Sequence, residues 1–309
     1  MFVHDLNPVF IQIGFLEIRW YGILYALGFL FLFFFLHHVA KKKHIINFTK
    51  EDVEPFLIGL IISVVLGARL FHTMIYEPTI YFADPLRILF IFEGGLSFHG
   101  ALTFSALWIF YFCKKKHIPF FQLTDYIVLP AAFFLALGRM ANFVNAELVG
   151  KVTNVSWAVD FSKSNPLYEG FRHPTQLYEG AKNLFLFTIL IILNIYRRSV
   201  LKKMPFGIIT IIFLLFYGVF RFFIEFLKES GTILLGLNMG QILSVGMLLL
   251  AGYLLFVIFK TKKEIEKNAS PKNDAAISKS NSHSLQNNSQ NNNASFKKHS
   301  SKKKKRKNK

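Results

Sequence analysis

Cysteine is nearly absent from this chain, which has 309 residues and a single cysteine, Cys113. No internal disulfide can therefore form. Charge is also scarce, because Asp, Glu, Lys and Arg make up 17% of the residues against 53% for the hydrophobic ones. The weakly charged runs of about 20 residues that result are typical of a membrane protein and are rare in a soluble domain.

Acidic residues number 18 against 36 basic ones, which gives a net charge of +18. Much of the positive charge follows Lys260, and most of the rest forms short clusters between apolar runs. Elsewhere the basic residues do not line a polar face, so we expect no specific nucleic-acid partner. The first residues also lack the basic region that begins a secretory signal peptide. His4 and Asp5 stand near the start and no small-residue cleavage site follows, so we expect no cleavable signal peptide.

Seven apolar runs are long enough to cross a membrane as helices, which predicts an all-α polytopic membrane protein. They cover residues 20–39, 55–75, 87–112, 121–145, 180–196, 206–227 and 239–259. Residues 8–18 are predicted to be an interfacial segment and not a span. The polar stretch 146–178 separates the fourth and fifth spans, and in it Trp157, Val159 and Phe161 alternate as in a short strand.

The basic clusters follow every second span. They are Lys41 to Lys43, Lys114 to Lys116, Arg197 with Arg198, and Lys260. Positively charged loops stay in the cytoplasm, so we expect the N-terminus outside and the C-terminus inside. The segment 146–178 is then extracytoplasmic.

The chain divides into a membrane domain, 1–260, and a tail, 261–309, that is rich in Lys, Asn and Ser. The tail cannot bury a core, so we expect it to be disordered in the cytoplasm. Its basic end suits anionic lipid or RNA, although a solvated and dispensable extension is the simpler interpretation.

Polar side chains inside or beside the spans gather at one predicted depth, in the outer half of the bilayer. They are Tyr21, Arg69, Arg139, Asn142, His173, Gln176, Glu179, Arg221 and Glu225. Charged groups at membrane depth usually face a cavity, a ligand or one another. The three arginines therefore predict one site, open to the outer leaflet, for an anionic ligand such as a phospholipid headgroup.

Two pairs in this set have alternative interpretations. Arg139 and Asn142 share a helix face and suit a phosphate or carboxylate, but a polar helix–helix contact is the alternative. Arg221 and Glu225 are spaced i,i+4 and can pair with each other, and Tyr217 lies on the same face.

His99 is predicted to lie deeper. It is about a dozen residues into the third span, which is about 18 Å at 1.5 Å per residue, near the midplane. Because histidine exchanges protons near neutral pH, His99 beside Ser97 and Glu93 is a candidate base. A helix–helix hydrogen bond is the other interpretation.

Three motifs carry most of these residues. The run Gly138 to Gly150 contains Arg139, Asn142, Asn145 and Glu147, the run Gly94 to Gly100 contains His99, and the third runs from His173 to Glu179. In this order they resemble the prolipoprotein diacylglyceryl transferase family of bacteria, and Tyr21, Tyr217, Arg221, Glu225 and the run Met239 to Ser244 match it too. The resemblance covers about residues 5–260. Ala141 and Ala146 stand where that family usually has glycine, and the segment between spans four and five is short.

The resemblance implies an enzyme of the bacterial inner membrane with seven spans and its active site facing the outer leaflet. That family moves the diacylglyceryl group of phosphatidylglycerol onto the lipobox cysteine of a preprolipoprotein, forming a thioether and releasing glycerol phosphate. The implied partners are phosphatidylglycerol, preprolipoprotein signal peptides and membrane lipids. No cofactor is implied, and no spacing of His, Cys and carboxylates asks for a metal.

The resemblance also implies residue roles. The catalytic residues would be His99, Arg139, Arg221 and Tyr217. The headgroup would be bound by Arg139, Asn142, Asn145, Tyr21, Glu147, Gly150 and Arg221, with Arg69, His173, Gln176 and Glu225 in support. The arginines would clamp the leaving phosphate, Glu147 and Glu225 would position them, and His99 would take the thiol proton or shape the cavity.

A transporter of an anionic solute or lipid is the competing interpretation. Arginines in the membrane suit it, but transporters often contain paired halves, and the sequence has no evident internal repeat. A retinal-type sensor would need a lysine in the seventh span, and an intramembrane serine protease a Gly-x-Ser-Gly context. A CDP-alcohol transferase would need clustered aspartates. The sequence has none of these features.

Overall fold

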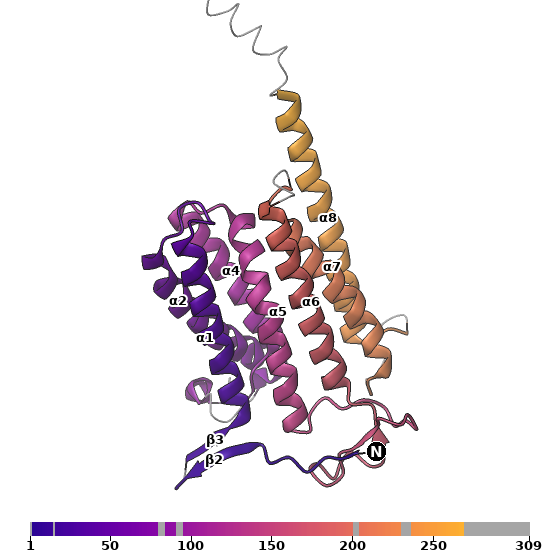
Figure 1. Ribbon diagram of the computed structural model, residues 1–309. Coiled ribbons are helices and arrows are strands. Elements are labelled where there is room, and N and C mark those ends of the chain that lie inside the picture. The colour runs from indigo at the N-terminus through magenta and orange to yellow at the C-terminus, as the bar shows by residue number, and fades with distance from the viewer. Residues whose placement is uncertain are drawn as a thin grey trace, which may run out of the picture. The chain divides into compact units, whose positions relative to one another are not determined.

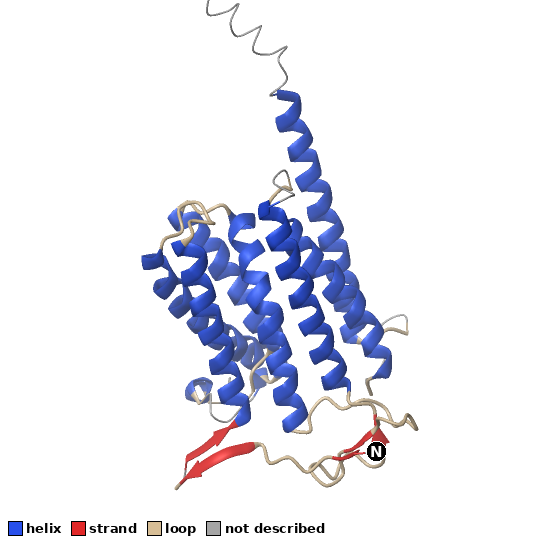
Figure 2. Ribbon diagram, in the orientation of Figure 1, coloured by secondary structure: helices blue, strands red, loops and turns tan. Residues whose placement is uncertain are grey.

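In the computed structural model the described residues are 2–14, 16–79, 84–90, 95–199, 204–229 and 236–268. Within them lie seven long helices, which form most of the structure (Figures 1 and 2). They are α1 (Trp20–Lys41), α2 (Val53–Phe71), α4 (Phe98–Lys116), α5 (Phe120–Val144), α6 (Thr175–Ser199), α7 (Ile208–Ile224) and α8 (Met239–Asn268).

Six of these helices are long and apolar enough to cross a membrane, among the residues that the structure describes. The exception is α4, which ends in the three lysines Lys114 to Lys116. The prediction of an all-α polytopic membrane protein is confirmed, with six spans found by this criterion and α4 as the seventh long helix. The predicted tail lies outside the described residues from 269 onward.

The chain forms two compact units, Met1–Leu255 and Phe256–Lys309. The second unit is described only as far as Asn268, where α8 ends. In the first unit α5 packs against both α1 and α6, α6 packs against α7, and α2 packs against α4 (Figure 1). Successive long helices run in opposite directions, so the ends of α5 and α7 meet the starts of α1, α6 and α8 at one end of the bundle.

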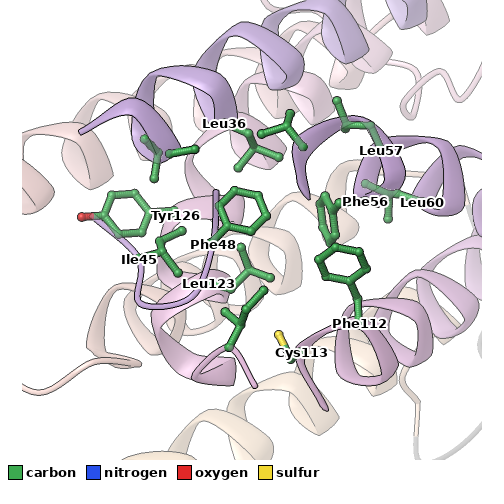
Figure 3. Close-up of a cluster of buried hydrophobic side chains, with 14 of the residues drawn as sticks. Leu36, Ile45, Phe48, Phe56, Leu57, Leu60, Phe112, Cys113, Leu123 and Tyr126 are labelled. Carbon is green, nitrogen blue, oxygen red and sulfur yellow. The ribbon is translucent and has the colours of Figure 1, made fainter. Parts of the chain in front are cut away.

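The opposite end of the bundle, where the lysine-rich connections lie, holds an apolar core. Leu36, Phe56, Phe112, Leu123 and Tyr126 are all buried there and come from α1, α2, α4 and α5 (Figure 3). Ile45 and Phe48, from the connection between α1 and α2, close the cluster. This core fixes four helices to one another, so the polar residues can gather at the other end.

Helix α4 begins later than the sequence predicted. The expected span started at residue 87, but Pro85–Leu89 forms a 3₁₀ helix, η3, and α4 starts at Phe98. Gly95 has a positive φ of 69°, and the Ser97 side chain accepts a hydrogen bond from the Gly100 nitrogen as an N-cap. His99 therefore lies in the first turn of α4, and its predicted position near the midplane is wrong. Glu93 and Gly94 lie outside the described residues.

Short strands and turns cover the polar end of the bundle. Strands β2 (Val9–Ile13) and β3 (Leu16–Arg19) form an antiparallel hairpin, so residues 8–18 are indeed no span. Strand β4 (Val159–Asp160) pairs with β1 (Phe2–Val3) in parallel and with β5 (Phe171–Arg172) in antiparallel orientation. The strand predicted around Val159 is thus confirmed, as two residues.

Further short helices within the described residues flank the long ones. They include η1 (Lys50–Asp52), η2 (His72–Tyr76) and η5 (Glu225–Leu227). Helix α6 starts at Thr175, five residues before the predicted boundary at 180, directly after Pro174. Proline suits the start of a helix because its missing N–H is not needed there. Gln176 and Glu179 therefore lie within α6.

Candidate active site

The buried carboxylate of Glu179, on α6, lies at the centre of the polar end. The Glu179 side chain is 1% exposed. Its Oε2 atom lies 2.8 Å from Nε of Arg139 on α5. Its Oε1 atom pairs with both Arg221 of α7 and Lys228, which follows η5. One acidic side chain thus links α5, α6 and the end of α7.

A second carboxylate, Glu225, holds the α7 side of the site. Arg221 Nη2 lies 3.0 Å from Glu225 Oε2, which is the i,i+4 pair that the sequence predicted. A Cβ added to Gly240 would lie only 2.5 Å from the Glu225 carboxyl carbon, so the first turn of α8 packs directly on this carboxylate. The N-terminus of a helix is a favourable place for an acidic side chain, and Glu225 lies against the first turn of α8.

On the α5 side a chain of hydrogen bonds runs from Arg139 to α1. Arg139 donates to Asn142 Oδ1 at 3.2 Å. Asn142 Nδ2 lies 3.3 Å from the Tyr21 hydroxyl and donates to Glu147 at 3.1 Å. Asn145 donates to the other oxygen of Glu147, also at 3.1 Å. The predicted shared face of Arg139 and Asn142 is confirmed.

The connection after α5 is fixed by main-chain contacts. Gln176 donates to the Glu147 carbonyl at 2.5 Å, and the Gly150 nitrogen donates to the His173 carbonyl at 3.0 Å. A Cβ on Gly150 would lie 2.7 Å from that carbonyl oxygen, so only glycine fits. In the structure Gly150 allows close packing between the segment after α5 and the start of α6.

Most of the predicted site residues come together. Tyr21, Arg139, Asn142, Asn145, Glu147, Gln176, Arg221 and Glu225 are joined by the contacts above. Tyr217, on α7, is 8% exposed and lies close to Arg139. The carboxylate that pairs with Arg139 directly is Glu179, and Glu147 is linked to Arg139 through Asn142.

Three other predicted residues make contacts elsewhere at this end of the chain's helices. Arg69 donates to the main-chain carbonyls of Ile88 at 3.0 Å, Phe90 at 3.1 Å and Gly95 at 3.4 Å, so it holds the connection between α2 and α4. His173 contacts the Tyr178 hydroxyl through Nδ1 at 3.1 Å, and burial lowers the pKa of this imidazole. His99 is half-buried at the start of α4, where its carbonyl accepts a hydrogen bond from Thr103.

The predicted site did not include two lysines, Lys182 and Lys228. It gave Glu179 a place in the polar cluster but no role. Lys228 is a buried partner of Glu179, and Lys182 is buried on α6. A signal existed for both. Lys182 stands three residues after Glu179 inside an apolar run, and Lys228 stands three residues after Glu225. Charged side chains at that spacing share a helix face and should have been counted with the arginines.

The arrangement is rich in positive charge. Its cations are Arg139, Lys182, Arg221 and Lys228, and its carboxylates are Glu147, Glu179 and Glu225. Guanidinium groups bind phosphate and carboxylate oxygens through paired N–H donors. The fold and the site together define a multi-pass membrane protein with a cation-rich polar site at one end of its bundle.

Comparisons with known proteins agree with that class. A model of the prolipoprotein diacylglyceryl transferase family matches residues 8–257, and the chain belongs to this family. It is 41% identical over 256 residues to the phosphatidylglycerol–prolipoprotein diacylglyceryl transferase of Rickettsia africae, covering 81% of this chain and 96% of that one. The Rickettsia typhi enzyme of the same name is 40% identical over 262 residues, covering 82% and 98%.

Proposed function

We propose that this protein transfers the diacylglyceryl group of phosphatidylglycerol to the lipobox cysteine of preprolipoproteins. The observation that carries the proposal is the convergence of Arg139 and Arg221 on one buried carboxylate, Glu179, at one end of a membrane-spanning bundle. Two guanidinium groups held in a fixed relation suit a phosphodiester and the phosphate that leaves from it. The family membership supplies the substrate class.

The reaction needs no nucleophile from the enzyme. The thiol sulfur of the substrate cysteine forms a bond to the glycerol carbon, and the bond between that carbon and the phosphate oxygen breaks. The electron pair stays on the phosphate oxygen, and the thiol proton passes to a base and then to the released glycerol phosphate or to water. The only cysteine of the enzyme, Cys113, is buried near the end of α4, away from the polar end.

Each part of the site has a role in this proposal. Arg139 and Arg221 bind the phosphodiester and stabilise the leaving phosphate. Asn142, Asn145 and Tyr21 orient the headgroup. His99, directly or through water, accepts the thiol proton, because it is the side chain in the predicted set best suited to proton exchange near neutral pH. Tyr217, which lies close to Arg139, assists His99 in this proton transfer.

The site opens to the outer leaflet of the bacterial inner membrane in this proposal. The lysine clusters that end α1 and α4 lie at the end of the bundle opposite to Glu179. Lysine-rich loops stay in the cytoplasm, which supports an outward orientation of the polar end. The lipobox cysteine of an exported precursor would then reach the site from outside.

The direct test is the transfer itself. Purified protein in phosphatidylglycerol liposomes receives a lipobox peptide, and mass spectrometry follows the mass of the diacylglyceryl adduct. We expect an adduct on the cysteine peptide and none on its Cys→Ser control. Folded protein that forms no adduct would overturn the proposal and favour a transporter of anionic solutes, to be tested by uptake into the same liposomes.

A further inference from the structure

Lys182 on α6 is a buried cation to which the proposed mechanism gives no task. It is 6% exposed, and its Nζ atom lies 3.8 Å from the centroid of the Tyr217 ring. Among the described residues this ammonium has no hydrogen-bond partner. A buried charge without such a partner is costly, and an aromatic face compensates only part of that cost.

The neighbouring carboxylate does not explain Lys182. Glu179 attracts it, but Glu179 already pairs with Arg139, Arg221 and Lys228. The same three cations repel Lys182. A fourth cation therefore adds positive charge to a site whose carboxylates are already paired. A ligand that supplies negative charge would balance this excess, since buried charges in proteins are normally paired.

The position of Lys182 indicates which part of a ligand it would meet. Lys182 follows Glu179 by three residues on α6, and Tyr217 precedes Arg221 by four residues on α7. The pair Lys182–Tyr217 thus lies about one helical turn, roughly 5 Å, further into the bundle than the pair Glu179–Arg221. In a phospholipid the diacylglyceryl carbon and the acyl chains lie on this inner side of the phosphate.

We propose that Lys182 is a further phosphate-binding residue, which contacts the phospholipid phosphate from the membrane side, beside the carbon–oxygen bond that breaks. The proposal rests on the transferase function proposed above. When that bond breaks, the electron pair stays on the phosphate oxygen that faced the diacylglyceryl carbon. An ammonium group at this oxygen stabilises the charge where it develops. Lys182 then lacks a hydrogen-bond partner in the free enzyme because the lipid phosphate is its partner.

The test compares Lys182→Met with Lys182→Arg and with Lys115→Met as a matched control. Lys115 also lies over a tyrosine ring, Tyr111, at 5.8 Å, but it is exposed at the opposite end of the bundle. Initial transfer rates are measured against the mole fraction of phosphatidylglycerol in mixed micelles. Thermal unfolding of each variant is measured without lipid, with phosphatidylglycerol and with zwitterionic phosphatidylcholine.

We expect Lys182→Met to lower kcat/KM for phosphatidylglycerol about 10- to 100-fold, as the loss of one charged hydrogen bond does. Its Tm without lipid should be equal to or above that of the wild type, because an unpaired buried charge is gone. The stabilisation by phosphatidylglycerol should shrink, since less lipid binds the folded state. Lys182→Arg should keep most of the wild-type kcat/KM and most of the stabilisation by phosphatidylglycerol. Lys115→Met should match the wild type in both.

Three results would overturn the proposal. A lower Tm with unchanged kinetics would make Lys182 a structural partner of Tyr217. A lower kcat with unchanged lipid stabilisation and an altered pH–rate profile would make it a proton carrier. Equal stabilisation of wild type and Lys182→Met by phosphatidylglycerol would exclude phosphate binding. If the wild type transfers nothing, the proposed function fails, but the lipid-dependent Tm still decides the role of Lys182.

Discussion

Arg139 and Arg221 bind opposite oxygens of the same carboxylate, that of Glu179, although they come from helices α5 and α7. The distance between the two guanidinium groups is therefore set by α6. Glu179→Gln keeps the volume but leaves two arginines facing each other without their counter-charge. We expect transfer to fall at least about 100-fold and the free energy of unfolding to fall by about 3–5 kcal/mol.

The control for this variant is Glu229→Gln. Glu229 also pairs with an arginine, Arg172 at 2.6 Å, but its side chain is 61% exposed. Arg172 is buried but keeps its hydrogen bonds to the Glu169 and Gly150 carbonyls, and solvent reaches Glu229. The pair should therefore contribute about 0–1 kcal/mol, and this variant should keep its transfer rate with little change in Tm. Similar losses in both variants, measured by the liposome assay and by thermal unfolding, would contradict the central role of Glu179.

Arg139→Ala should abolish transfer while the amount of protein in the membrane stays near normal. Arg139 is the residue that joins Glu179 to Asn142, so its loss disconnects the headgroup-binding amides from the buried carboxylate. Arg139→Lys should also lose about 100-fold, because an ammonium cannot reproduce the planar fork of donors. Transfer assays on equal amounts of membrane protein measure both. Disappearance of the protein itself would indicate a structural role instead.

The sequence predicted the helical architecture from the length of its apolar runs, and one cluster of polar residues from the depth that the topology gave them. Arg139 with Asn142 and Arg221 with Glu225 were visible as i,i+3 and i,i+4 pairs, and the structure contains both contacts. Such pairs lie on one helix, so helical geometry alone brings them together.

Contacts between helices could not be predicted in the same way. The partner of Arg139 is on α6, and the connection between α2 and α4 is held by Arg69 through main-chain carbonyls. Neither contact leaves a pattern in a single sequence. The apolar run from 87 to 112 concealed the break before Phe98, because a glycine with positive φ followed by an N-cap serine starts a new helix without interrupting the run.

A second buried ion pair, missed from the sequence, should control stability without affecting catalysis. Asp125 is fully buried on α5, accepts from Arg197 at 2.5 Å and accepts from the main-chain nitrogens of Gly207 and Thr210 at 2.8 Å each. Asp125→Asn leaves Arg197 buried and unpaired, so the free energy of unfolding should fall by about 3–5 kcal/mol. The rate per folded enzyme should not change, because this pair lies at the other end of α5 from Arg139.

Asp5→Asn is the matched control for that experiment, because Asp5 pairs with Lys163 at the surface. We expect its Tm to stay at the wild-type value. Thermal unfolding and single-concentration transfer rates distinguish the outcomes. A wild-type Tm for Asp125→Asn would show that the buried pair does not stabilise the fold.

Helices α2 and α4 are in contact through two glycines. A Cβ on Gly67 would lie 2.5 Å from the Gly100 carbonyl oxygen, so Gly67→Ala must force the helices apart. We expect a loss of about 1–3 kcal/mol in the free energy of unfolding, the usual cost of overpacking. Gly246→Ala on α8 is the control, since a Cβ there meets nothing within 4 Å and alanine favours a helix by up to about 1 kcal/mol. If both variants shift the Tm in the same direction, the close approach of α2 and α4 does not determine the stability of the fold.

His4 should make stability depend on pH. Its side chain is fully buried, contacts Ser164 Oγ through Nδ1 at 2.7 Å and lies between the rings of Phe143 and Phe161. Burial lowers the pKa of His4 below its usual value of 6.5, although the Phe143 main chain and Asp5 oppose this. The unfolded state therefore binds the proton more readily than the folded state. The contribution of His4 is fully present above about pH 6.5 and is lost as the pH falls through the lower folded pKa.

The measurement compares the Tm of the wild type with that of His4→Gln between pH 7.5 and 5. Glutamine can still bond to Ser164 but does not titrate in this range. We expect the Tm of the wild type to fall more steeply than that of the variant. His173, whose pKa burial also lowers, is present in both proteins, so its effect cancels in the difference. Parallel curves would show that His4 stays neutral or solvated, and that the contact between the N-terminal segment and residues 143–164 is insensitive to protonation.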